Sequence, residues 1–79
     1  MNLKDIGYRI KFIRINKMNY SQEDFAKFLN LDKTYICRVE NGKQNLTIEN
    51  LIKICDGLNV TLSDFFDFSN VDIIKGEND

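Results

Sequence analysis

Two short helical patterns, separated by only a few residues, constrain the fold of this chain more than any other feature. Ser21 can cap the first helix, and Asp24, three residues on, can complete a capping box. Asp32 can cap the second helix, and the pair Asn41-Gly42 can end it. The pattern predicts a helix-turn-helix at about residues 21–41.

Helical periodicity recurs on both sides of this pair. Apolar residues spaced three and four apart predict a first helix that ends near Lys17, and Thr47 and Thr61 can cap a fourth and a fifth helix. Connections of about 2–6 residues are typical of a compact all-α domain. We therefore predict a five-helix domain at residues 1–66 and a partly apolar C-terminal tail at 67–79. The apolar stripe of the first helix consists of Leu3, Ile6, Ile10 and Ile13, and the fifth helix bears Leu62, Phe65 and Phe66. The side chains of the other helices predicted to face inward are Phe25, Ala26, Leu29, Tyr35, Ile36, Val39, Leu51, Ile54, Cys55 and Leu58.

Composition excludes several classes of function. No apolar run approaches the roughly 18–20 residues of a transmembrane helix, and Lys4 and Asp5 interrupt the start before the apolar run of a signal peptide can form. We expect a cytoplasmic protein that does not bind membranes. The chain has no histidine and only two cysteines, Cys37 and Cys55, so a metal site is not expected and catalysis lacks its commonest general base. We expect no enzyme, no cofactor and no small-molecule substrate.

Charge is distributed unevenly along the chain. The net charge is −1, but residues 1–43 hold nine Lys/Arg against five Asp/Glu, whereas residues 44–79 hold two against seven. A basic half of this kind can face phosphate while the total charge stays near zero. The distribution is compatible with double-stranded DNA as the partner.

A helical wheel places the polar side chains of the second helix of the pair on one outward face. That face contains Lys33, Thr34, Cys37, Arg38 and Asn41. Groups of these kinds suit base edges in the major groove: Arg38 can pair with guanine O6 and N7, and Asn41 can address adenine or a phosphate. The alternative is a polar face that is merely solvated.

Two further residues are candidates for phosphate contacts. Gln22 opens the first helix of the pair, where its backbone N–H and its side-chain amide can bind phosphate at the positive helix end. Lys43 lies in the loop beyond the second helix and is better placed for phosphate than for bases.

Several motifs together carry a family resemblance: Ile6–Lys11, Arg14, Ser21–Ala26, Tyr35–Lys43 and Leu51–Phe66. They look like the phage repressor/Cro-type (XRE) helix-turn-helix domain, whose fold is lambda-repressor-like, over roughly residues 5–66. Within that family, Leu31–Ile36 and Asn45–Ile48 are most similar to the restriction–modification controller proteins, which are small dimeric regulators.

The resemblance implies roles for individual residues. It implies DNA contacts at Gln22, Lys33, Thr34, Cys37, Arg38, Asn41 and Lys43. It also implies a structural ion pair between Glu40 and a first-helix arginine, here Arg14. The ring of Tyr35 is expected to pack at the edge of the core and to leave its hydroxyl for a phosphate.

The chain departs from the family pattern at three places. The turn Lys17–Tyr20 lacks the usual glycine, and Asn19 is expected to adopt the left-handed conformation instead. Cys37 replaces a usual serine, either as a plain small residue or as a thiol whose oxidation blocks binding. Gln44 stands where many relatives carry a basic residue, which predicts the loss of one phosphate contact.

The chain has more apolar residues than one core face of each helix requires, which suggests a contact between subunits. Tyr8, Phe12 and Ile15 form a second stripe on the first helix, and we expect Phe68–Ile74 to cover it, in cis or from a second subunit. A homodimer contact is predicted near the acidic half. Its expected residues, which could instead fill the core of the monomer, are Leu62, Phe65, Phe66 and Phe68.

Two functions remain open from the sequence. The first is a sequence-specific transcriptional regulator, a homodimer on a short palindromic operator, with its own promoter as one candidate target. The second is a protein-interaction module of the same fold, an antitoxin-like partner binder with little DNA affinity. The cations at 33, 38 and 43 favour the first.

Overall fold

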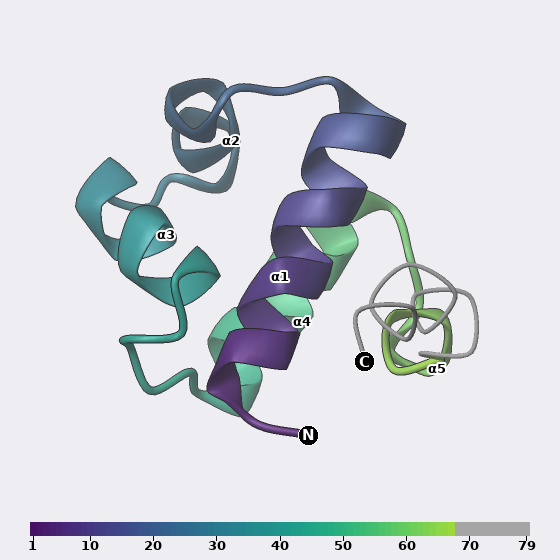
Figure 1. Ribbon diagram of the computed structural model, residues 1–79. Helices are drawn as coiled ribbons and strands as arrows, with labels where there is room; N and C mark the ends of the chain where they lie inside the picture. Colours follow the sequence, from purple (N-terminus) through teal and green to yellow (C-terminus); the bar gives the residue numbers. More distant parts are fainter. Residues whose placement is uncertain (68–79) are drawn as a thin grey trace.

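Helices account for nearly all the regular structure in residues 1–67, which are the residues that the computed structural model describes. The helix-turn-helix formed by α2 and α3 lies on one side of α1, and α5 lies on the other side (Figure 1). The predicted all-α fold with five α-helices is confirmed for this part of the chain. In chain order the elements are α1 (Leu3–Ile13), the π-helical turn η1 (Arg14–Met18), α2 (Gln22–Leu29), α3 (Lys33–Glu40), α4 (Ile48–Leu58) and α5 (Leu62–Phe65).

The core forms where the apolar stripes of these helices meet. Most side chains predicted to face inward are buried. Of the three large apolar residues at the fifth helix, Phe65 is buried, whereas Leu62 and Phe66 are 40% and 38% exposed. Phe65 is the side chain that α5, a helix of four residues, directs into the core. The buried apolar residues are Ile10, Ile13, Phe25, Ala26, Leu29, Ile36, Val39, Leu51, Ile54, Cys55, Leu58 and Phe65.

Capping residues set most of the helix starts. The side chains of Ser21, Thr47 and Thr61 each accept a hydrogen bond from the backbone N–H three residues on, as predicted. A reciprocal capping box is formed at Asn2 and Asp5, which the sequence reading missed, and not at Ser21. Asp32 occupies the N-cap position of α3 without a side-chain hydrogen bond, so its predicted capping bond is wrong.

Left-handed residues turn the chain at the helix ends. Asn19 has φ 58°, as expected for a turn without glycine. Asn30 and Asn59 adopt the same conformation after α2 and α4. Gly42, with φ +73°, follows the C-cap Asn41 of α3, so the predicted end of that helix is confirmed.

Helix α1 approaches α3 closely at Gly7. A Cβ atom at this position would lie 2.6 Å from the carbonyl oxygen of Glu40 and would also collide with that of Val39. The absence of a side chain at Gly7 therefore allows the two backbones to pack together. This contact sets the position of the C-terminal part of α3.

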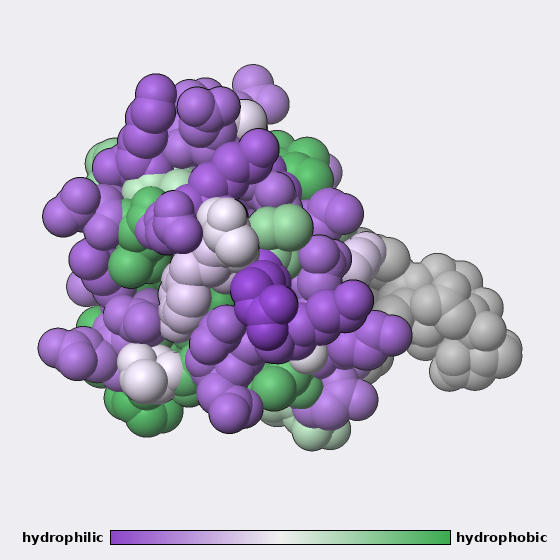
Figure 2. All heavy atoms as spheres, turned by 90° about the vertical axis from the view of Figure 1, so that its left-hand side faces the viewer, coloured by the Kyte–Doolittle hydropathy of each residue, from purple (hydrophilic) through white to green (hydrophobic). Residues whose placement is uncertain are grey.

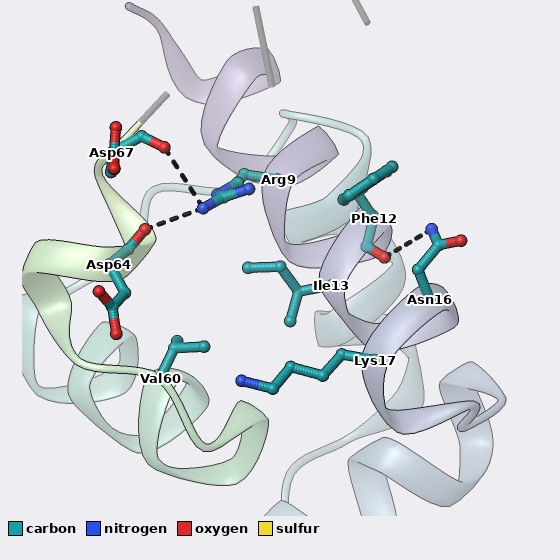
Figure 3. A pocket seen from close by; sticks show the side chains of 8 residues that line it. All are labelled: Arg9, Phe12, Ile13, Asn16, Lys17, Val60, Asp64 and Asp67. Atoms are coloured by element: carbon teal, nitrogen blue, oxygen red, sulfur yellow. Dashed lines mark hydrogen bonds between the residues drawn. The ribbon is translucent and has the colours of Figure 1, made fainter. Parts of the chain in front are cut away.

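A buried arginine connects α1 to the end of the described chain. Arg9 Nε donates to the carbonyl oxygen of Phe65 at 3.0 Å. Arg9 Nη2 donates to the carbonyl oxygens of Asp64 at 2.8 Å and Asp67 at 3.4 Å (Figure 3). The sequence reading missed this role, because Arg9 looks like any basic residue on an amphipathic helix. No helix within residues 1–67 is long and apolar enough to cross a membrane.

Candidate nucleic-acid interface

The predicted polar residues of α3 lie together on its outer side. Lys33, Thr34, Arg38 and Asn41 are exposed and Cys37 is half-buried, and we call these five residues the α3 outer face. Four of them, all but Asn41, line a shallow hollow of about 240 Å³. Figure 2 shows this side of the molecule, where hydrophilic side chains dominate and hydrophobic ones form separate patches.

The opposite side of α3 fastens it to the domain. Ile36 and Val39 are buried in the core, and the next residue, Glu40, forms a buried ion pair with Arg14. Arg14 Nε lies 2.7 Å from Glu40 Oε2, and Arg14 Nη2 lies 3.0 Å from Glu40 Oε1. Arg14 Nη1 also donates to the carbonyl oxygen of Tyr20 at 2.6 Å. These bonds connect the end of the first helix to α3 and to the turn before α2.

Gln22 belongs to the same internal network. Its Nε2 donates to Glu40 Oε1 at 2.9 Å, and its side chain is half-buried. One of the two amide protons is therefore used inside the domain, and the contact of this amide with phosphate stays a prediction. The backbone N–H of Gln22 lies in the first turn of α2, where helix N–H groups have no intrahelical partner. That group keeps the geometry of a phosphate ligand.

Arg38 is held by the loop that follows α3. Its Nε donates to Gln44 Oε1 at 3.1 Å, and its Nη2 donates to the carbonyl oxygen of Lys43 at 2.9 Å. Lys43 is itself exposed in this loop, and its backbone carbonyl contacts Arg38 of the α3 outer face. Sequence reasoning identified Arg38 and Lys43 but missed the contact between them.

Asn41 and Cys37 contact each other on the α3 outer face. Asn41 Nδ2 lies 3.6 Å from Cys37 Sγ, which is within the range of a weak hydrogen bond to sulfur. Asn41 is also the C-cap of α3, one turn after Cys37. The side chain of Asn41 therefore sits at the C-terminal edge of the face rather than at its centre.

The hydroxyl of Tyr35 is directed to α4. Its oxygen accepts a hydrogen bond from Asn50 Nδ2 at 2.9 Å, and its ring packs at the edge of the core. The ring lies where the sequence predicted. The hydroxyl is not free, however, and only its proton remains to be donated to a phosphate. Asn50 was missed, since no motif in the sequence connects it with Tyr35.

The two cysteines lie in different environments. Cys55 is 2% exposed, and its burial, with a further contribution from the charge of Asp56, raises the pKa of its thiol from 9.0 to about 11. Cys37 is half-buried on the α3 outer face. In residues 1–67 no group of three His, Cys, Asp or Glu side chains is placed to hold a metal ion.

The predicted dimer-contact residues do not form one exposed patch. Phe65 is fully buried, so for this residue the alternative holds and the ring fills the core of the monomer. Phe66 packs edge-on against it, with ring centroids 5.1 Å apart, and its outer side remains exposed together with Leu62. Phe68 lies outside the described residues.

The second apolar stripe of the first helix is partly exposed. Tyr8 and Ile15 are 41% and 45% exposed, and Phe12 is half-buried beside Tyr8, with ring centroids 6.3 Å apart. Phe12 also borders a hollow of about 400 Å³ between the first helix and α5 (Figure 3). The predicted cover of the stripe, Phe68–Ile74, lies outside the described residues.

Comparison with known proteins places these features in a family. A family model described as helix-turn-helix matches residues 10–65. The chain is 47% identical over 60 residues to the control protein C.MunI from Mycoplasma sp, a match that covers 76% of this chain and 81% of that protein. It is 37% identical over 65 residues to the control protein C.BamHI from Bacillus amyloliquefaciens, covering 82% and 80% of the two chains.

A solved structure of similar shape contains DNA. The crystal structure of the restriction–modification controller protein C.Esp1396I tetramer, in complex with its natural 35 base-pair operator, superposes on this chain with a TM-score of 0.78. The two chains are 40% identical, and the match covers 92% of this chain and 95% of that one.

Proposed function

Because this chain belongs to the helix-turn-helix family and, within it, to the restriction–modification control proteins, we propose that it regulates transcription by sequence-specific binding to DNA. It acts as a homodimer on a short palindromic operator, with its own promoter as one candidate target. The observation that carries the proposal is the α3 outer face. Its cations and short polar groups point outward, while the Arg14–Glu40 pair fastens the helix from behind.

The chemistry of the α3 outer face favours DNA in the major groove. Arg38 has guanidinium donors that match guanine O6 and N7, and Lys33 and Thr34 offer shorter contacts at the start of the helix. Lys43 and the backbone N–H of Gln22 flank the face and suit phosphate oxygens. Base contacts then determine the sequence that is bound, and phosphate contacts set the register of the protein on the duplex.

A dimer follows from the small size of one such face. A single helix-turn-helix contacts only a few base pairs, whereas a two-fold pair reads two half-sites about one helical turn apart. The partly exposed apolar side chains of Leu62 and Phe66 can be buried in a contact between subunits. They lie at α5, on the side of α1 away from the helix-turn-helix (Figure 1). The relatives named above are control proteins, and we propose no catalytic role.

The test is a salt titration of binding to random-sequence duplex, followed by selection from a randomised DNA pool. We expect log affinity to fall steeply and linearly with log salt, because phosphate contacts release counterions. We also expect the selected sequences to contain an inverted repeat. Negligible affinity for duplex at low salt would contradict the proposal and would favour a protein-interaction module of the same fold.

A further inference from the structure

We propose that Gln44 is a positioning residue for Arg38, and that the loop after α3 presents one edge of the guanidinium to DNA. The inference deepens the proposed function and rests on it. Gln44 is uncharged and half-buried, so a sequence reading assigns it no contact with phosphate. In the structure Gln44 instead accepts a hydrogen bond from Arg38, the residue that we propose contacts DNA.

The two loop acceptors occupy one edge of the guanidinium. Arg38 Nε donates to Gln44 Oε1 at 3.1 Å and Arg38 Nη2 donates to the carbonyl oxygen of Lys43 at 2.9 Å. A guanidinium has five N–H donors in a fixed plane. The loop therefore leaves both protons of Nη1 and one proton of Nη2. One proton of each of these two nitrogens forms the end of the fork. That end can bind guanine O6 and N7, or two phosphate oxygens, with two parallel hydrogen bonds.

The loop that supplies these acceptors is itself fixed to α3. The backbone N–H of Lys43 donates to the carbonyl oxygen of Arg38 at 2.9 Å, and that of Gly42 donates to the carbonyl oxygen of Val39 at 3.1 Å. Gly42 has φ +73°, and a Cβ atom there would lie 2.7 Å from Lys4 Cα. The backbone therefore returns along the end of α3 and carries the side chain of Gln44 to Arg38.

An uncharged acceptor is suited to this task. Holding a flexible side chain before binding removes an ordering cost of about 0.5–1.5 kcal/mol at the moment of binding, which corresponds to roughly two- to tenfold in affinity. A carboxylate at the same position would hold the guanidinium more strongly but would also neutralise it and repel phosphate. Gln44 orients Arg38 while leaving its positive charge available.

The experiment compares variants of the full chain on the operator obtained by selection. Gln44→Met removes the acceptor and keeps the side-chain length, and we expect operator affinity to fall roughly two- to tenfold. The salt slope should not change, because no charge is lost, and the preference for the base pair read by Arg38 should relax. Arg38→Ala should weaken binding more and flatten the slope by about one unit. The double variant should bind no worse than Arg38→Ala alone.

Two controls separate positioning from general damage. Asn45→Ala changes the next residue of the same loop and should leave affinity within twofold of wild type. Gln44→Glu should weaken binding and flatten the salt slope, which an effect on loop stability alone would not produce. Additive losses in the double variant, or Gln44→Met with wild-type affinity and base preference, would overturn the inference while the regulator proposal stands. A wild-type chain with no affinity for duplex would overturn both.

Discussion

Arg14 and Glu40 form a buried ion pair through two parallel hydrogen bonds, and their side chains are only 6% and 1% exposed. The pair joins the C-terminal end of the first helix to the last residue of α3. Gln22 donates to the same carboxylate, so three helical segments meet at one charged group. Together with the buried side chains of Ile36 and Val39, this group holds α3 so that the α3 outer face points away from the core.

We expect Glu40→Gln to lower the free energy of unfolding by about 3 kcal/mol, because it leaves the Arg14 guanidinium buried without its counter-charge. Urea denaturation of the purified chain measures the change. The matched control is Glu23→Gln, which removes an exposed pair with Lys27 at 3.9 Å and should change stability by less than about 0.5 kcal/mol. Equal effects of the two substitutions would contradict the role of the buried pair.

Gly7→Ala is expected to destabilise the fold by about 1–3 kcal/mol, because the added methyl group would collide with backbone carbonyl oxygens of α3. Neither α1 nor α3 can move without disturbing the core between them. Thermal unfolding followed by circular dichroism checks the prediction. Lys11→Ala places the same residue at an exposed site of α1 and should leave the unfolding temperature almost unchanged. If Gly7→Ala were as stable as wild type, α1 and α3 could move apart at little cost, and the prediction would be wrong.

Lys33→Ala should weaken binding to duplex and flatten the dependence of log affinity on log salt by about one unit, if the ammonium group contacts a phosphate. The free energy of unfolding should stay within about 0.5 kcal/mol of wild type, as is usual for exposed positions. Fluorescence anisotropy at several salt concentrations gives the slope. Lys17→Ala is the control, since Lys17 points toward Val60 and donates to the carbonyl oxygen of Asn59 (Figure 3). The same slope for both variants would argue against Lys33 as a contact.

Stability should depend on pH through Cys55. The pKa of its thiol is raised from 9.0 to about 11 in the folded chain, so the unfolded chain loses this proton first as the pH rises. The stabilising contribution is complete below pH 9 and is lost between about pH 9 and 11, with a slope of at most about 1.4 kcal/mol per pH unit.

The difference in unfolding free energy between wild type and Cys55→Ala isolates this effect, because other titrating groups are common to both chains. As the pH rises from about 9 to 11, the unfolding free energy of the wild type should fall relative to that of Cys55→Ala. Cys55→Val, which also lacks the thiol but fills more volume, should show the same pH dependence with a different offset. A difference that is constant with pH would rule out the shifted thiol.

Phe66→Glu combined with Leu62→Glu should convert a dimer into a monomer without unfolding it, because both side chains are partly exposed at α5. Sedimentation equilibrium measures the mass. Phe28→Glu is the matched control, since Phe28 is also an exposed aromatic residue but lies on α2. Phe65→Ala should instead unfold the chain or cost about 3–5 kcal/mol, because that ring is fully buried. A dimer that persists in the double variant would place the contact elsewhere.

Local patterns in the sequence were enough to predict the helices and the α3 outer face. Ser21, Thr47 and Thr61 mark helix starts through bonds that span three residues, and periodicity separates Ile36 and Val39 from Lys33 and Arg38. Asn19 in a left-handed turn belongs to the same class of local signal. Each of these features depends on neighbours within one or two helical turns, which the sequence displays directly.

Only the tertiary structure decided which polar groups point outward and which hold the domain together. Gln22 reaches Glu40 across 18 positions, and Arg9 reaches the carbonyl oxygen of Phe65 across 56. Burial of Phe65 beside an exposed Phe66 depends on how a single helical turn docks on the core. Such contacts follow from the packing of segments that are distant in the sequence. The residues next to a polar or aromatic side chain in the sequence do not indicate which distant residue it will contact.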